Sequence, residues 1–160
     1  MLNGSWSSTN SLEFWNKGNT STGLNNSPVY KTIYDPSPTD FSVPKPAAFT
    51  GFTTTGSSTS TYSQFNVNGA YNKGWNFYCL PNFGGTTIFL SSFGYRDVAS
   101  VRVNSSTAGQ LSEAGLKANY WVTGTSNTLN NAIYIGFNST SIQPGIEVMR
   151  AFGLNLCPAY

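Results

Sequence analysis

The side chains that most often carry out acid–base and nucleophilic chemistry are scarce in this sequence. The 160 residues contain no histidine, and the six carboxylates stand apart from one another: Glu13, Asp35, Asp40, Asp97, Glu113 and Glu147. The commonest general base is therefore missing, and a serine nucleophile has no imidazole to accept its proton. The glycines of "NFGG", residues 82–85, are typical of a turn rather than of a phosphate-binding loop. The residue types predict a protein that is not an enzyme and has no cofactor.

The two cysteines, Cys79 and Cys157, leave two alternatives open. If they pair, the bridge closes a loop of nearly half the chain and stabilises the fold by about 4 kcal/mol in the loop-entropy model. Otherwise they are two buried free thiols, as is common in proteins assembled in a reducing compartment. Two distant cysteines without histidine match no zinc-binding spacing, so no metal site is expected.

Charge argues against several classes of partner. Charged residues make up 9% of the chain and the net charge is +2, whereas about a quarter of an average protein is charged. Lysine and arginine occur singly, so no basic run is available to neutralise the phosphates of a nucleic acid. No apolar stretch approaches the roughly 20 residues of a membrane span, so no membrane insertion is expected. The start of the chain lacks the pattern of a signal peptide and suggests a cut from a longer chain.

One stretch has the composition of a binding surface. In "YWVTGTSNTLNNAIYIGFN", residues 120–138, aromatic residues alternate with small polar ones and no residue is charged. Aromatic rings supply large contact areas at low entropic cost, and Ser, Thr and Asn supply adaptable hydrogen bonds. The alternative is that the apolar residues belong to the core of two strands and the asparagines lie in turns. A sugar and a flat protein epitope fit this composition equally well.

Strand alternation divides this stretch into two faces. Tyr120 and Val122 share one face with Ile133, Ile135 and Phe137, which have the apolar character of a core. The opposite face and the connecting loop are then predicted to point outward and to bind the ligand, with Trp121 as the energetic centre. This predicted patch consists of Trp121, Thr123, Thr125, Asn127, Asn130, Asn131, Tyr134 and Asn138.

The elements that must position such a patch are mostly strands. Short, roughly alternating segments predict strands at 86–96, 99–104, 119–124, 131–138 and 150–157. Helical signals are confined to 45–52, where a proline suits the first turn, and to one short turn within 108–118. The first 29 residues have the composition of irregular backbone pinned by aromatic side chains. No repeat or domain boundary divides the chain, so residues 1–160 are expected to form a single domain.

Three stretches carry a resemblance to a known family. They are "KTIYDPSPTDFSVPKPAAF" (31–49), "LSSFGYRD" (90–97) and the segment from 119 to 157 that contains the predicted patch. In this order they resemble the Fibrobacter succinogenes major paralogous domain and related C-terminal domains of Bacteroidetes surface proteins and phage tail fibres. That family looks like a branch of the C-type lectin-like fold, near the formylglycine-generating-enzyme subtype. Variable proteins of diversity-generating retroelements share this subtype.

The resemblance implies an α+β fold, namely a C-type lectin-like domain with a small twisted antiparallel sheet, one or two short helices and long loops. It implies a receptor-binding adhesin of the virion tail fibre that recognises a glycan or protein on a bacterial surface. The expected partners are this receptor, the rest of a longer fibre chain and two further copies in a homotrimer. The alternative is a structural or surface-exposed domain of a Bacteroidetes cell envelope.

The resemblance also suggests roles for individual residues. Tyr95 is expected to pack and Arg96 to bind loop carbonyls, so both are structural. Family members often have a cysteine where Ser37 stands, and Cys79 would replace it as the partner of Cys157. Lectins of the wider fold bind calcium, but "QPG" (143–145) and "GWNFY" (74–78) lack the carboxylates that calcium requires. The paired reactive cysteines of a formylglycine-generating enzyme are also missing. Binding without calcium is therefore expected.

Overall fold

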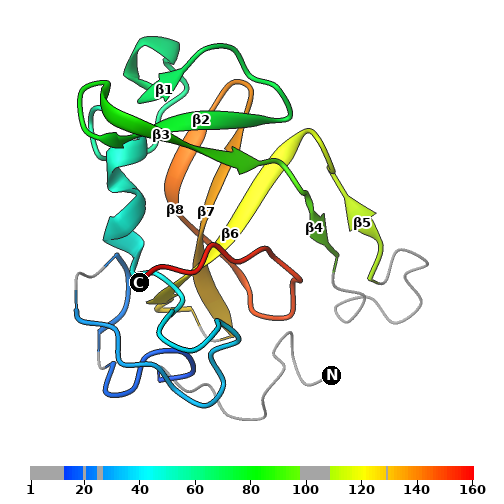
Figure 1. The fold of residues 1–160 in the computed structure, drawn as a ribbon. Helices are drawn as coiled ribbons and strands as arrows, with labels where there is room; N and C mark the ends of the chain where they lie inside the picture. Colours follow the sequence, from blue (N-terminus) through cyan, green and yellow to red (C-terminus); the bar gives the residue numbers. More distant parts are fainter. Residues whose placement is uncertain (1–12, 20, 25–26, 98–108, 129) are drawn as a thin grey trace.

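The computed structural model describes residues 13–19, 21–24, 27–97, 109–128 and 130–160, and it shows a small domain built mostly from antiparallel sheet (Figure 1). Two short 3-10 helices accompany the strands, so the architecture is compatible with an α+β or a mostly-β class. The elements are η1 (Pro46–Phe52), η2 (Tyr62–Gln64), β1 (Val67–Asn68), β2 (Gly74–Leu80), β3 (Gly84–Ser91), β4 (Tyr95–Arg96), β5 (Leu111–Ser112), β6 (Lys117–Thr125), β7 (Asn131–Asn138) and β8 (Ile142–Met149).

Within the described residues, the strands form three antiparallel sheets. The largest has the order β6-β7-β8, the second has the order β1-β2-β3, and β4 pairs with β5 in a two-stranded ladder. Figure 1 shows the second sheet lying across one end of the first, with η1 along one side and the described residues before η1 gathered at the other end. The short β4–β5 ladder projects from the opposite side of the large sheet.

The main core fills the space between the two larger sheets and η1. Tyr120 and Val122 from β6 and Ile135 and Phe137 from β7 are buried there, as strand alternation predicts. The ring of Phe52, at the end of η1, stacks on Phe77 of β2 with centroids 3.8 Å apart. Aromatic packing thus ties the helix and both sheets into one unit.

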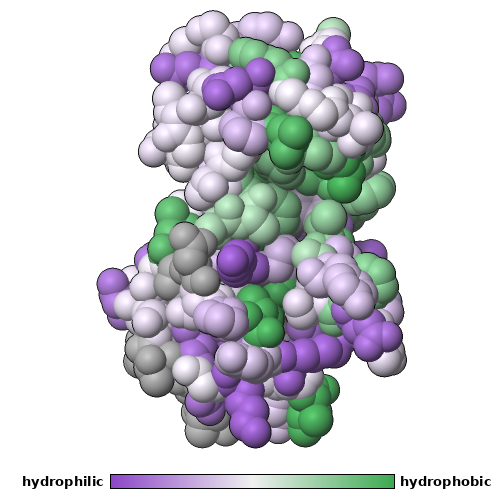
Figure 2. Space-filling model, turned by 60° about the vertical axis from the view of Figure 1, so that its left-hand side comes forward, coloured by the Kyte–Doolittle hydropathy of each residue, from purple (hydrophilic) through white to green (hydrophobic). Residues whose placement is uncertain are grey.

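The predicted helix at 45–52 forms as a 3-10 helix. Pro46 occupies its first turn, where a missing N–H costs nothing. Phe49 and Phe52 are three residues apart, so the three-residue turn places both rings on the buried side, with centroids 5.2 Å apart. Figure 2 shows the side of the molecule that carries this helix, where apolar residues gather across a narrow middle.

The other predicted elements have mixed outcomes. The strands predicted at 119–124 and 131–138 are present as β6 and β7, and the strand predicted at 86–96 divides into β3 and β4. Residues 99–104 lie outside the described residues. The described part of 108–118 contains β5 and a turn. The prediction of a strand at 150–157 is wrong, because this segment makes only isolated bridges through Gly153 and Asn155.

The sequence did not predict two of the longer strands, β2 and β8. Pro144 and Gly145 resemble turn residues, yet they lie within β8. The position is tolerated because β8 is an edge strand and its pairing with β7 is irregular beside them.

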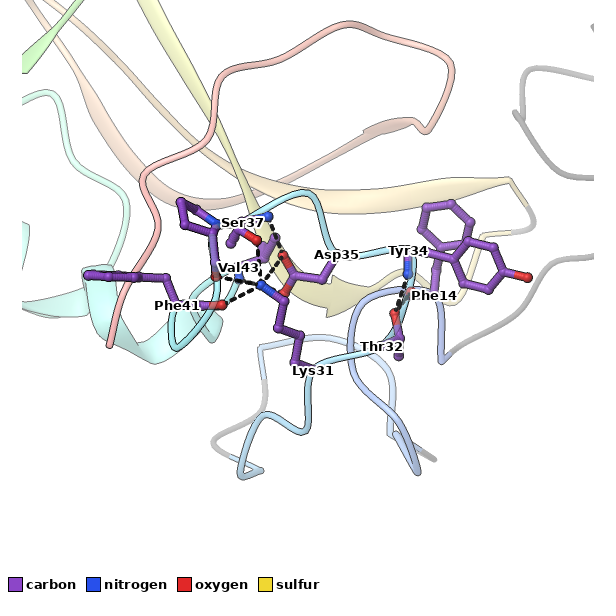
Figure 3. Close-up of polar contacts among 9 residues, drawn as sticks. Phe14, Lys31, Thr32, Tyr34, Asp35, Ser37, Phe41 and Val43 are labelled. Atoms are coloured by element: carbon purple, nitrogen blue, oxygen red, sulfur yellow. Dashed lines mark hydrogen bonds and ion pairs between the residues drawn. The ribbon is translucent and has the colours of Figure 1, made fainter.

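The proline-rich segment before η1 is organised around a buried carboxylate (Figure 3). Asp35 Oδ1 accepts the Ser37 N–H at 2.8 Å, and Oδ2 accepts the Val43 N–H at 2.9 Å. Lys31 Nζ lies 4.0 Å from Asp35 Oδ1 and donates to the carbonyls of Pro38 and Phe41, both at 2.7 Å. The Asp35 carboxylate thus caps the turn through both of its oxygens. The segment is therefore fixed by side-chain contacts rather than by regular secondary structure.

Candidate functional site

The outward patch predicted on β6 and β7 is largely buried, so that prediction of exposure is wrong for half of its residues. Trp121 is only 2% exposed, and Thr123, Thr125 and Tyr134 are also buried. The two faces were assigned correctly, but the second face is covered as well. Trp121 and Tyr134 belong to a second hydrophobic cluster with Trp15, and residues of the C-terminal segment pack against it. Trp121 therefore cannot be an exposed energetic centre.

The remaining four predicted residues contribute to the fold, either through hydrogen bonds or through a turn conformation. Asn127 accepts a bond from Thr22, while Asn130 has a φ of +70° in the turn before β7. The carbonyl of Asn131 accepts Arg150 Nε at 3.1 Å, and Asn138 Oδ1 accepts the Thr140 N–H at 2.8 Å.

Thr125 joins the strand to the N-terminal segment. Its hydroxyl donates to the Ser21 carbonyl at 3.1 Å and accepts Asn19 Nδ2 at 3.4 Å. The backbone of Thr123 makes a similar link, since its N–H donates to the Pro44 carbonyl at 2.9 Å. Of the eight predicted residues, only Tyr134 lines either of the two surface hollows that are described in the next paragraph.

Two adjoining hollows form a cleft between β4 and the second face of the large sheet. We call it the tyrosine cleft, because Tyr95 lines both parts together with Leu154. The outer hollow has a volume of about 380 Å³ and is lined by Phe93, Gly94, Tyr95, Arg96, Leu111, Gly153, Leu154 and Asn155. The inner hollow has a volume of about 170 Å³ and is lined by Tyr95, Lys117, Asn119, Tyr134, Val148, Phe152 and Leu154. No carboxylate appears among these lining residues.

The floor of the inner hollow is the second face of the large sheet. Lys117 and Asn119 alternate along β6, Tyr134 comes from β7, and Val148 comes from β8. Asn119 lies opposite Gly136 in the β6–β7 register. A Cβ atom at Gly136 would come within 3.0 Å of Tyr134 Cε2 and 2.9 Å of Ile146 Cδ1. The glycine thus lets the Tyr134 ring lie close to the sheet beside Asn119.

The C-terminal segment forms the wall that faces this floor. The backbone N–H of Trp121 donates to the backbone carbonyl of Asn155 at 2.9 Å, and the backbone N–H of Asn155 donates to the backbone carbonyl of Asn119 at 3.0 Å. Asn155 Nδ2 also donates to the Gly94 carbonyl at 3.0 Å. These bonds run alongside β6, so Phe152 and Leu154 are held over the sheet.

The β4 side of the cleft depends on a glycine. Gly94 has a φ of +71°, and a Cβ atom there would lie 2.1 Å from the Ser112 carbonyl oxygen. Only glycine, which has no Cβ atom, fits this backbone angle and this close approach. The adjacent Tyr95 ring meets Phe152 with centroids 5.6 Å apart. Arg96 Nη1 donates to the Gly109 carbonyl at 2.8 Å, a bond of the kind expected for its structural role.

The electrostatics of the cleft favour protonated tyrosines and balanced charge. Burial raises the pKa of Tyr134, and the negative charges of ionised Tyr95 and of Glu113 raise it further. Burial also raises the pKa of Tyr95, with added contributions from Glu113 and Asp97. Both hydroxyls therefore stay neutral at physiological pH and remain able to donate. Lys117 Nζ lies 3.8 Å from Glu113 Oε2, so the cation that lines the inner hollow is balanced by an anion.

The cysteines are both free, which excludes the disulfide alternative in this structure. Cys79 is exposed, whereas Cys157 is partly buried against the main core. The expectation that Cys79 replaces the missing family cysteine as the partner of Cys157 is therefore wrong. Burial raises the pKa of the Cys157 thiol, so it is a poor nucleophile at neutral pH.

Within the described residues, His, Cys, Asp and Glu side chains nowhere gather in groups of three or more that could hold a metal ion. The same part of the chain contains no helix that is both long and apolar enough to cross a bilayer.

Sequence analysis missed most of the cleft. The segment around Phe152 was interpreted as a strand, and Asn119 was not separated from the other asparagines near it. The available signal was the stretch "SFGYR", residues 92–96, where an aromatic residue stands on each side of a glycine. No family model, curated protein or solved structure matches the chain.

Proposed function

We propose that this domain binds a receptor, as the adhesin of a phage tail fibre or similar surface protein, and that the tyrosine cleft is its binding site. The receptor is a glycan or protein of the bacterial surface. The observation that carries this proposal is the lining of the cleft, which combines aromatic rings and side-chain amides without a carboxylate. Rings pack on the apolar faces of a ligand while amides and hydroxyls orient it.

The exposed aromatic at the mouth of the cleft supports this role. Phe93 is 58% exposed although it lies next to the buried Ser92 and Gly94. Leu111 across the outer hollow is 56% exposed. Apolar side chains held in the open on a rigid frame are typical of a surface that another molecule covers.

The fold we propose is the C-type lectin-like one. Its support is the order of the three resembling stretches and the architecture they adopt, with small antiparallel sheets, short helices and long loops. The capped proline segment around Asp35 and the tight Gly94 turn give two of these stretches physical roles that explain their residue types.

The proposal is tested by binding of the purified domain to intact Bacteroidetes cells, with a glycan array beside it. Phe93→Ala removes an exposed ring from the outer hollow and should weaken cell binding by about tenfold, as truncation of an interface anchor does. Phe83→Ala is the matched control, because Phe83 is 50% exposed but lies in the β2–β3 turn and lines neither hollow.

Thermal melting of both variants should match the wild type, since both rings are exposed. Equal cell binding by Phe93→Ala and the wild type would show that the cleft is not the receptor site. Failure of the wild-type domain to bind any cell or glycan would favour a structural role in a cell envelope.

A further inference from the structure

We propose that the inner hollow of the tyrosine cleft holds the acetamido group of an N-acetylated hexosamine, with the sugar ring in the outer hollow. This inference rests on the proposed receptor-binding function and names the chemical class of the ligand at that site. Three features of the inner hollow carry it: an unpartnered amide oxygen, apolar walls and balanced charge.

The unpartnered group is Asn119 Oδ1. Asn119 is 2% exposed, and this oxygen has no hydrogen-bond partner within the described part of the chain. A buried polar atom without a partner destabilises a fold, so its presence on the floor of a hollow points to a ligand that supplies the missing bond. An acetamido group has an N–H donor beside a C=O acceptor and can therefore pair with the amide of an asparagine side chain.

The walls around Asn119 suit the methyl end of the acetamido group. Val148, Phe152 and Leu154 supply apolar surface, and the rings of Tyr95 and Tyr134 close the remaining sides. A sugar hydroxyl in this position would leave part of its hydrogen-bonding capacity unsatisfied against these walls. A methyl group gains from the same contacts, because apolar surface is removed from water.

The inner hollow is large enough to hold a small substituent of a sugar. Its volume is about 170 Å³. One water molecule occupies roughly 30 Å³ in the liquid, so the hollow is several times larger. The outer hollow, at about 380 Å³, is the larger of the two and shares Tyr95 and Leu154 with the inner one. A pyranose ring beside Phe93 can therefore extend its 2-substituent past Tyr95 to Asn119.

The charges favour a neutral sugar over an acidic or a basic one. Lys117 at the inner hollow is paired with Glu113, and Arg96 at the outer hollow already donates to the Gly109 carbonyl. Burial raises the pKa of Tyr95, and the nearby Glu113 and Asp97 raise it further, so negative and positive groups surround the cleft together. The charged side chains at the cleft already have partners, so a uronate or a free amino sugar would find no free opposite charge. The acetamido form is neutral and needs none.

The test compares four probes by saturation-transfer NMR and titration calorimetry: the methyl glycosides of N-acetylglucosamine, N-acetylgalactosamine, glucose and galactose. We expect binding of at least one acetamido sugar, with the strongest saturation on its acetyl methyl, and at least about tenfold weaker binding of the matching sugar without it. Equal binding of the matched pair, no binding of either acetamido sugar, or saturation confined to the ring protons would overturn the inference.

Asn119→Leu separates a ligand-binding role from a structural one. The substitution removes the unpartnered oxygen while keeping a similar volume, so the melting temperature should stay unchanged or rise. Binding of the acetamido sugar should fall by about tenfold or more. Val148→Phe gives a second reading, because the larger ring fills the hollow from β8 and should block the acetamido group. Unchanged sugar binding by either folded variant would contradict the proposed position.

The two proposals fail in different ways. If Phe93→Ala abolishes cell binding while acetamido sugars do not bind, the cleft is the receptor site but its ligand is of another class. If neither cleft variant affects cell binding, the site itself is wrongly placed.

Discussion

The indole ring of Trp15 packs edge-on against that of Trp121, with ring centroids 5.6 Å apart and planes inclined by 61°. Trp121 makes a second edge-on contact with Tyr134 across β6 and β7, at 6.4 Å. The N-terminal segment is therefore an integral layer of the domain, because it supplies the side chain that closes the second face of the large sheet.

We predict that Trp15→Ala destabilises the domain by about 3–5 kcal/mol, the usual effect of removing a buried tryptophan. The free energy of unfolding in urea measures this. Tyr30→Ala in the same segment is the control, because Tyr30 is 63% exposed, and it should change stability by less than about 0.5 kcal/mol. A small effect of Trp15→Ala would mean that the N-terminal layer is dispensable.

The carboxylate of Asp35 gives a second prediction. Both of its oxygens accept backbone N–H groups, from Ser37 and Val43, while Lys31 bridges the surrounding carbonyls. Asp35→Asn replaces one acceptor by a donor, so one buried N–H loses its partner, at a cost of about 2 kcal/mol. Asp40→Asn changes an exposed carboxylate nearby and should have little effect. Equal urea midpoints for the two variants would contradict the capping role.

The free cysteines should differ in reactivity. Cys79 is exposed, whereas Cys157 is partly buried and its pKa is raised. Since the thiolate is the reactive form, Cys79 should be alkylated by iodoacetamide at neutral pH well before Cys157. Mass spectrometry of tryptic peptides over time measures both rates, and unfolding in urea should bring them together. Similar alkylation rates in the folded protein would show that burial against the main core does not protect Cys157.

The sequence predicted the core of the fold better than its surface. Alternation in β6 and β7 gave the two faces correctly, because side chains of a strand must point to opposite sides. The same pattern could not tell whether the second face meets solvent or another layer. Trp121 is buried because Trp15, about a hundred residues earlier in the chain, and the C-terminal segment both pack against it.

The tyrosine cleft was beyond sequence reasoning for a related cause. Its lining comes from β4, from three strands of the large sheet and from an irregular C-terminal segment. No short-range periodicity links Tyr95, Asn119 and Phe152, because irregular backbone is held by individual hydrogen bonds such as those of Asn155. Local rules did predict an element with a local cause, since the proline in the first turn marked the start of η1.

The last prediction concerns stability at high pH. Burial raises the pKa of Tyr120 above the ordinary tyrosine value near 10, and the negative charge of the Cys157 thiolate raises it further. Tyr95 and Tyr134 are shifted in the same direction. Above about pH 10 the unfolded chain therefore releases protons that the native state retains, so the native state binds more protons. The contribution of these tyrosines to stability should be constant below this range and be lost as the pH rises through it.

Tyr120→Phe tests the origin of this loss. The Tyr120 hydroxyl donates to the Ser91 carbonyl at 2.7 Å, so its removal should destabilise the protein by about 1 kcal/mol at neutral pH. The variant has no phenol to ionise at this position, and its melting temperature should therefore decline less steeply above about pH 10 than that of the wild type. Thermal melts at intervals from neutral to alkaline pH provide the comparison, with Tyr30→Phe as the control because Tyr30 is exposed. Parallel declines for Tyr120→Phe and the wild type would show that the buried Tyr120 hydroxyl does not govern alkaline unfolding.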